Sequence, residues 1–114
     1  MPKLGPEVVS EEGLRDLLEL GYQAVVVCLE TPSWKQRVWY GLWVIRCVSL
    51  DGKSDRILVT VRRSKDDGDK PRTFRTVNGV FNFLHTLGFR TITIPMEQGG
   101  SVAHNLAHHG ATLA

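Results

Sequence analysis

The sequence predicts an α+β fold, with a small antiparallel sheet of about four strands, a helix packed across one face and a short N-terminal helix. Residues 38–62 hold two runs of alternating apolar and polar residues around Asp51-Gly52, which is typical of an antiparallel hairpin. Residues 76–88 carry apolar residues at helical spacing between a capping threonine and a glycine. The length of 114 residues and the 42% hydrophobic content indicate one domain with one core.

The first 30 residues predict an arm, a short helix and a strand. Residues 1–9 contain two prolines and are expected to form an extended arm. Ser10 is a helix cap, and acidic residues follow it in the first turn, where the helix dipole favours them. Gly21 ends this helix. Residues 22–29 would be apolar on both faces of a strand and are rich in valine, which predicts a strand covered on each side.

A loop through Pro32 is expected over residues 31–37. It presents Trp34 beside Lys35 and Arg37, and such a trio can stack a nucleic-acid base and hold a phosphate. A tryptophan that packs over its own hairpin is the alternative interpretation of the same residues.

Residues 38–50 predict a long strand with Trp39, Trp43 and Ile45 on one face. Gly41 indicates a bulge or bend within it. Because apolar residues also occupy the other face, the predicted sheet is too small for its helices to cover both sides. A homodimer is therefore a possible state of the chain.

The second half of the chain predicts a strand over 57–62, a charged loop over 63–71 and a helix capped by Thr76. A further strand is expected over 89–94, and residues 97–114 are expected to form a flexible or short helical tail. The apolar stripe expected to pack the helix on the core comprises Val77, Val80, Phe81, Leu84 and Leu87.

Charge is distributed unevenly along the chain. Residues 1–30 have two basic and six acidic residues, a net charge of −4, whereas residues 31–114 have twelve basic and six acidic residues, a net charge of +6. Folding the 63–71 connection back would gather cations at one end of the sheet, where they could bind phosphate or an acidic protein. A solvated loop with paired charges is the alternative. We call this predicted cluster the basic edge: Arg62, Arg63, Lys65, Lys70, Arg72 and Arg75.

The sequence gives little support to an enzyme or a metal protein. It has no phosphate-binding loop, no dinucleotide-binding glycine motif and no nucleophile elbow. His104 and His108 share the spacing of zinc hydrolases but lack the intervening glutamate, so neither a metal nor a cofactor is predicted. Cys28 and Cys47 are expected to be reduced, buried thiols. Without a long apolar run or a signal-peptide pattern, a soluble cytoplasmic protein is expected.

One segment resembles a known family. The runs Ile57–Arg63, Pro71–Arg75 and Val80–Leu84, with the closing strand near Ile94, resemble small ParC-like partition-associated proteins of plasmids and integrative elements. The resemblance spans about a third of the chain and implies an accessory role in the maintenance of mobile DNA. It implies no catalytic residue.

Two functional hypotheses follow from these observations. The first is a non-enzymatic accessory or regulatory protein of a mobile genetic element, which acts through a basic surface on nucleic acid or a nucleoprotein partner. The second is a small phage- or plasmid-encoded antagonist of a host defence complex, which acts by protein–protein occlusion.

Overall fold

The computed structural model describes residues 7–60 and 70–106, which form nine helices and strands. In chain order they are β1 (Glu7–Val9), α1 (Glu11–Glu19), β2 (Gln23–Lys35), β3 (Val38–Val48), β4 (Asp55–Thr60), β5 (Lys70–Pro71), β6 (Phe74–Thr76), α2 (Val77–Thr86) and β7 (Ser101–Asn105).

The strands form one mixed seven-stranded sheet, which confirms the α+β class and corrects the expected antiparallel sheet of about four strands. The main order is β1-β4-β3-β2-β7, while β5 pairs with β4 and β6 pairs with β3. The β1 strand runs parallel to β4, and the other pairings are antiparallel. Strands of two or three residues, such as β1, β5 and β6, are too short for a periodicity to reveal them, which is why the sequence predicted fewer.

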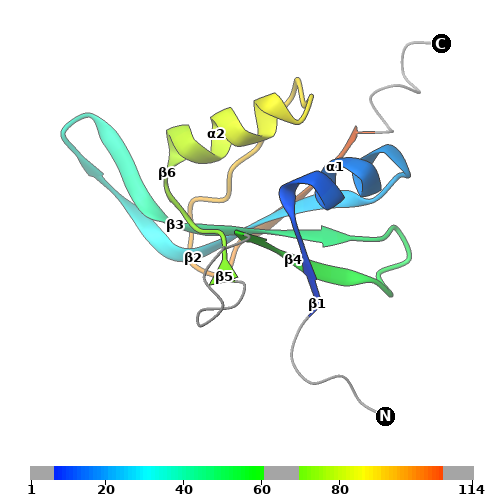
Figure 1. Ribbon diagram of the computed structural model, residues 1–114. Helices are drawn as coiled ribbons and strands as arrows, with labels where there is room; N and C mark the ends of the chain where they lie inside the picture. Colours follow the sequence, from blue (N-terminus) through cyan, green and yellow to red (C-terminus); the bar gives the residue numbers. More distant parts are fainter. Residues whose placement is uncertain (1–6, 61–69, 107–114) are drawn as a thin grey trace.

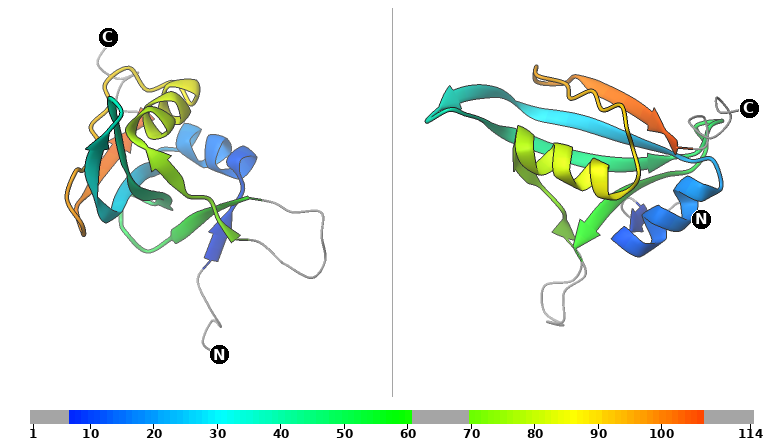
Figure 2. Two further views of the ribbon diagram at one scale, coloured as in Figure 1. Left: turned by 90° about the vertical axis from the view of Figure 1, so that its left-hand side faces the viewer. Right: turned by 90° about the horizontal axis from the view of Figure 1, so that it is seen from above.

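Both helices lie on the same face of this sheet (Figures 1 and 2). Each begins at the predicted cap: the Ser10 hydroxyl accepts a hydrogen bond from the Gly13 amide, and the Thr76 hydroxyl accepts one from the Gly79 amide. Gly88 follows α2 with φ 109°, a backbone conformation that residues other than glycine rarely adopt. The strand predicted to be covered on both sides, β2, is therefore covered by helices on one side only.

The core lies between the sheet and the helices. From β3 it receives Trp43, Ile45 and Cys47, none of which is exposed. The Trp43 indole Nε1–H donates a hydrogen bond of 2.8 Å to the Pro95 carbonyl, so the one polar atom of this side chain is satisfied inside the core. Further core residues come from both helices and from the segment after α2, namely Leu14, Leu18, Val80, Phe83, Leu84, Leu87 and Phe89.

The stripe of α2 that faces the core differs by one position from the predicted one. Phe83 is buried and packs against Phe74, with ring centroids 5.2 Å apart, whereas Phe81 is 47% exposed and stacks on His85. Residues 80, 83, 84 and 87 have the same spacing as the predicted stripe, so periodicity alone did not separate the two phenylalanines. The position of β6, next to the start of α2, decides which of them is buried.

Two predictions for the C-terminal third were wrong. Residues 89–94 are not a strand, and residues 101–105 of the expected tail form β7 at the edge of the sheet. The alternation of Ile92 and Ile94 reflects packing against the core without a strand partner. His104 in β7 holds this segment: its Nε2 accepts a hydrogen bond of 3.0 Å from the Thr93 amide, and its Nδ1 lies 3.3 Å from the Ala24 carbonyl.

The two helices of the described chain, of nine and ten residues, are both too short and too polar to cross a bilayer. An extended arm is expected over residues 1–9, and within it residues 7–9 form β1, a strand of the sheet. Residues 1–6 lie outside the described ranges.

Candidate functional site

The β2–β3 hairpin extends beyond the rest of the sheet, and its tip projects at the upper left of Figure 1. The predicted loop over 31–37 is instead a continuation of β2 to Lys35, followed by a two-residue turn. Pro32 fits within the strand because the pairing is irregular between Glu30 and Ser33, where no ladder hydrogen bond from its nitrogen is needed.

The turn itself has an uncommon backbone. Gln36 and Arg37 have φ of 50° and 67°, the left-handed values that a tight two-residue hairpin turn needs at both central positions. Glycine or asparagine usually occupies such positions, so a glutamine and an arginine here carry local strain. The arginine at the tip therefore occupies a position whose backbone conformation is disfavoured for it.

Aromatic and cationic side chains gather at this tip. Trp34 pairs with Trp39 across the hairpin, with ring centroids 5.2 Å apart, yet Trp34 remains 56% exposed. The alternative of a tryptophan packed over its own hairpin is therefore met, while most of the ring still faces solvent. Lys35, at the end of β2, and Arg37, within the turn, are both exposed. We call Trp34, Lys35, Arg37 and Trp39 the hairpin tip.

The basic edge is only partly described. Arg62, Arg63 and Lys65 lie outside the described ranges. Lys70 in β5 and Arg75 in β6 are exposed, and neither makes an ion pair within residues 7–60 and 70–106. The structure brings Arg75 next to the hairpin stem, because β6 pairs with β3 at Tyr40 and Trp43.

Arg72 differs from these cations because its side chain, although 37% exposed, packs against other parts of the fold. Its guanidinium lies 4.6 Å from the ring centroid of Phe83 and 5.2 Å from that of Phe74, and its Nη1 lies 3.0 Å from Glu11 Oε1. Arg15 contacts the same carboxylate at 3.1 Å and donates a hydrogen bond to the Thr86 carbonyl. These contacts join α1, α2 and β6, so Arg72 has a structural role that the sequence did not indicate.

The Glu11 carboxylate is tuned by these two arginines. Partial burial acts to raise its pKa, but the hydrogen bonds from Arg15 and Arg72, with their charges, outweigh this and lower the pKa from its ordinary value of 4.5. The ionised form of Glu11 is therefore the one that the fold prefers.

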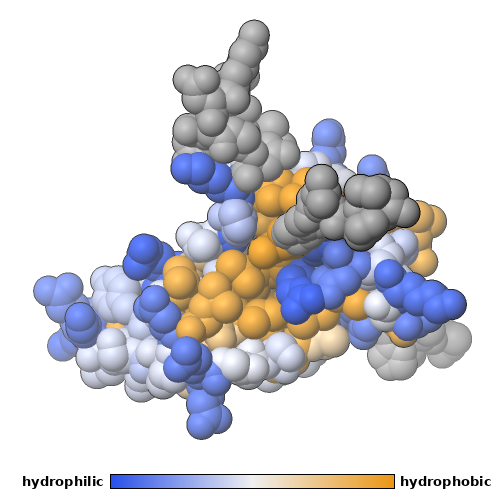
Figure 3. Space-filling view, turned by 90° about the horizontal axis from the view of Figure 1, so that it is seen from below, coloured by the Kyte–Doolittle hydropathy of each residue, from blue (hydrophilic) through white to orange (hydrophobic). Residues whose placement is uncertain are grey.

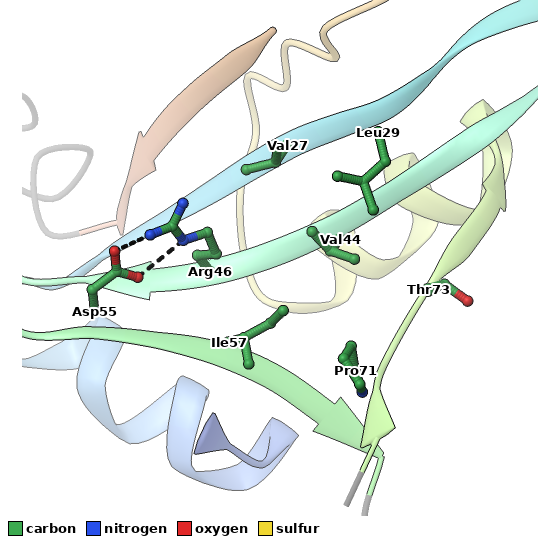
Figure 4. A pocket seen from close by; sticks show the side chains of 8 residues that line it. All are labelled: Val27, Leu29, Val44, Arg46, Asp55, Ile57, Pro71 and Thr73. Carbon is green, nitrogen blue, oxygen red and sulfur yellow. Dashed lines mark hydrogen bonds and ion pairs between the residues drawn. The ribbon is translucent and has the colours of Figure 1, made fainter. Parts of the chain in front are cut away.

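The face of the sheet opposite the helices is open and apolar at its centre (Figure 3). A groove of about 610 Å³ lies on it, between the diverging strands β4 and β6 (Figure 4). Its polar lining is Thr73 and the ion pair of Arg46 with Asp55, which joins two oxygens to the guanidinium. Its apolar lining consists of Val27, Leu29, Val44, Ile57 and Pro71. The sequence indicated an uncovered apolar face, but it gave no signal for the groove.

Residues suited to metal or redox chemistry do not gather in the part of the chain that is described. No group of three or more histidine, cysteine or acidic residues there could hold a metal ion. His104 is buried in β7 and not on a helix, and both of its ring nitrogens have protein partners; His108 lies outside the described ranges. Cys28 and Cys47 are free and buried, as predicted, and burial raises the pKa of the Cys47 thiol to about 11.

Comparison of the chain with protein-family models, with curated proteins and with solved structures found no match. The function is therefore inferred from the geometry of the chain itself.

Proposed function

We propose that this protein is a non-enzymatic accessory protein of a mobile genetic element that binds single-stranded nucleic acid through the hairpin tip. The observation that carries the proposal is the exposure of Trp34 near the end of a projecting hairpin that also carries two exposed cations, Lys35 and Arg37. Bases stack on exposed aromatic rings whatever their sequence, and lysine and arginine neutralise the adjacent phosphates. The resemblance to ParC-like proteins implies an accessory role in the maintenance of mobile DNA, with which contacts to nucleic acid are compatible.

Several features of the hairpin favour binding over a purely structural role. Trp39 supports the Trp34 ring from one side, which fixes its orientation before a base arrives and lowers the entropy cost of stacking. Arg37 occupies a strained turn position where a glycine would be better for stability. Arg75, on the strand that pairs with the hairpin stem, extends the cationic surface beyond the tip.

Fluorescence anisotropy with a labelled single-stranded oligonucleotide tests the proposal. We expect Trp34→Ala to weaken binding by about 1–3 kcal/mol, the typical value of one base–aromatic contact. Lys35→Gln and Arg37→Gln should each reduce the salt slope by about 0.7 for single strands, with little change in sequence preference.

Two matched controls isolate the tip. Phe81→Ala removes another exposed aromatic ring, on the outer side of α2, and Lys53→Gln removes an exposed cation from the β3–β4 turn. Both should bind as the unchanged protein does. If the Trp34 and Phe81 variants bound equally well, the hairpin tip would not be the nucleic-acid site.

The basic edge can be tested separately from the tip. Lys70→Gln with Arg75→Gln leaves the core contacts intact, whereas changing Arg72 would also remove its ion pair and ring contacts. A loss of affinity and of salt slope in the double variant, with Trp34 unchanged, would extend the site from the tip to this edge.

A protein antagonist is the second candidate, and the apolar groove favours it. A partner could bury Leu29, Ile57 and their neighbours, as in interfaces with apolar centres and polar rims. This candidate predicts no affinity for oligonucleotides even at low salt, together with stoichiometric binding to one protein.

A further inference from the structure

The open face of the sheet has the size of a protein interface. The strands β1, β4 and β7 hold 3, 6 and 5 residues, and roughly eight residues each of β2 and β3 lie beside them. At about 4.8 Å between strands and about 3.3 Å per residue, the projected area is about 480 Å², and corrugation by side chains adds to it. A stable interface takes about 800 Å² of accessible surface from each partner, so this face is large enough for one.

The composition of the face suits packing against another sheet. Val8, Val27, Leu29, Val44 and Ile57 contribute its apolar centre, and both Val8 and Leu29 are about 40% exposed. Sheets pack face to face at about 10 Å through such side chains, as in β-sandwiches. In this protein, the second layer is missing on that side among the described residues.

Charged residues lie at the two ends of the apolar centre. Arg46 and Asp55 occupy one end, where β3 meets β4. Glu30 is opposite Leu42 in the ladder and therefore shares the open face at the hairpin end. Phe74 points into the core and Thr73 lines the groove on the open face. Because side chains alternate along a strand, Arg75 lies on the same face as Thr73, the open face.

The order of the strands makes these two ends complementary. Asp55 in β4 and Arg75 in β6 both lie on the same flank of β3, because β2 occupies the other flank. A two-fold axis parallel to the sheet and perpendicular to β3 exchanges the two ends and keeps the flanks. It brings Asp55 of each copy over Arg75 of the other, and Arg46 over the end that carries Glu30.

We propose that the open face binds a second copy of this chain, with the two sheets stacked about such a two-fold axis. The interface is isologous, so each favourable charge contact occurs twice. With one positive and one negative residue at each end, the described residues give the face no net charge that would repel its own copy. The inference is independent of nucleic-acid binding by the hairpin tip, although the dimer would carry two tips.

Sedimentation equilibrium tests the identity of the partner. The unchanged protein should dimerise, and Ile57→Glu should weaken the dimer at least about thirtyfold, because it buries a charge at the centre of the interface. Phe81→Glu changes an equally apolar, exposed residue on the helix side and should leave the dimer intact. A chain that stays monomeric on the order of 100 µM would overturn the proposal and leave the face to a foreign partner.

A cysteine pair tests the geometry without disturbing the apolar centre. The double variant Asp55→Cys with Arg75→Cys should form a covalent dimer with a short bifunctional thiol cross-linker, visible on a denaturing gel, because sheets about 10 Å apart are too distant for a direct disulfide, while Cys28 and Cys47 stay buried. Neither single variant should cross-link. Cross-linking of Asp55→Cys alone would show that like ends meet, and no cross-linking in any variant would reject the stacked arrangement.

Discussion

The two faces of the same strands have very different environments. Along β3, Trp43, Ile45 and Cys47 point toward the helices and are not exposed at all, whereas on the other face Leu42 and Val48 stay partly exposed, Arg46 is exposed and Val44 alone is buried. Both faces are apolar in sequence, but the described residues supply helices for only one. The comparison shows that apolar alternation indicates surfaces that can be buried, and that the number of helices decides which of them the fold buries.

The largest expected difference between the faces is in stability. Trp43→Ala should lower the free energy of unfolding by roughly 3–5 kcal/mol, because it leaves a core cavity and removes the donor to the Pro95 carbonyl. Ile57→Ala, on the open face, should cost about 1 kcal/mol or less in the monomer. Urea denaturation at low protein concentration measures both. Similar losses at the two sites would mean that the open face is covered within the monomer.

A second comparison sharpens the boundary of the covered face on α2. Phe83→Ala should cost roughly 3–5 kcal/mol, since its ring packs against Phe74 and Arg72. Phe81→Ala removes the same atoms from an exposed position and should cost about 1 kcal/mol or less. Thermal unfolding of the two variants decides between the observed stripe and the predicted one. A greater loss of stability in Phe81→Ala than in Phe83→Ala would show that Phe81, and not Phe83, packs in the core.

The smallest expected effect concerns the ion-pair cluster at the margin of the covered face. Because the pKa of Glu11 is lowered in the folded state, its contribution to stability is present above pH 4.5 and is lost as the pH falls through the lowered value. Glu11→Gln should therefore reduce stability near neutral pH and flatten its decline in acid. The control is Glu12→Gln, which removes an exposed carboxylate from the same helix turn and leaves the ion pairs of Glu11 with Arg15 and Arg72 in place. Unfolding followed by circular dichroism from pH 3 to 7 would contradict the role of Glu11 if both variants declined alike.

Several local features could be predicted because short-range physical chemistry decides them. Ser10 and Thr76 cap the two helices as expected, since a hydroxyl at that position satisfies a free amide. The turn at Asp51-Gly52 joins β3 to β4 for a similar reason, with Gly52 at φ 78°. The candidate site was predicted in part: Trp34, Lys35 and Arg37 were identified, although a loop was expected in place of the hairpin tip.

The features that the sequence did not reveal depend on distant partners. Ser101–Asn105 becomes a strand only because the edge of β2 is free to pair with it, while residues 89–94 find no such edge. Arg72, expected to be a surface cation, instead pairs with Glu11, 61 residues away, and packs against two buried phenylalanines.

The sequence by itself determined the starts of both helices, the β3–β4 turn and the strands β2, β3 and β4. The tertiary structure decided which apolar face is buried, which phenylalanine of α2 is in the core and where the groove lies. The physical reason is range: caps, turns and alternation depend on residues within a few positions. Burial depends on which elements meet, and only two helices are placed against this sheet in the described chain.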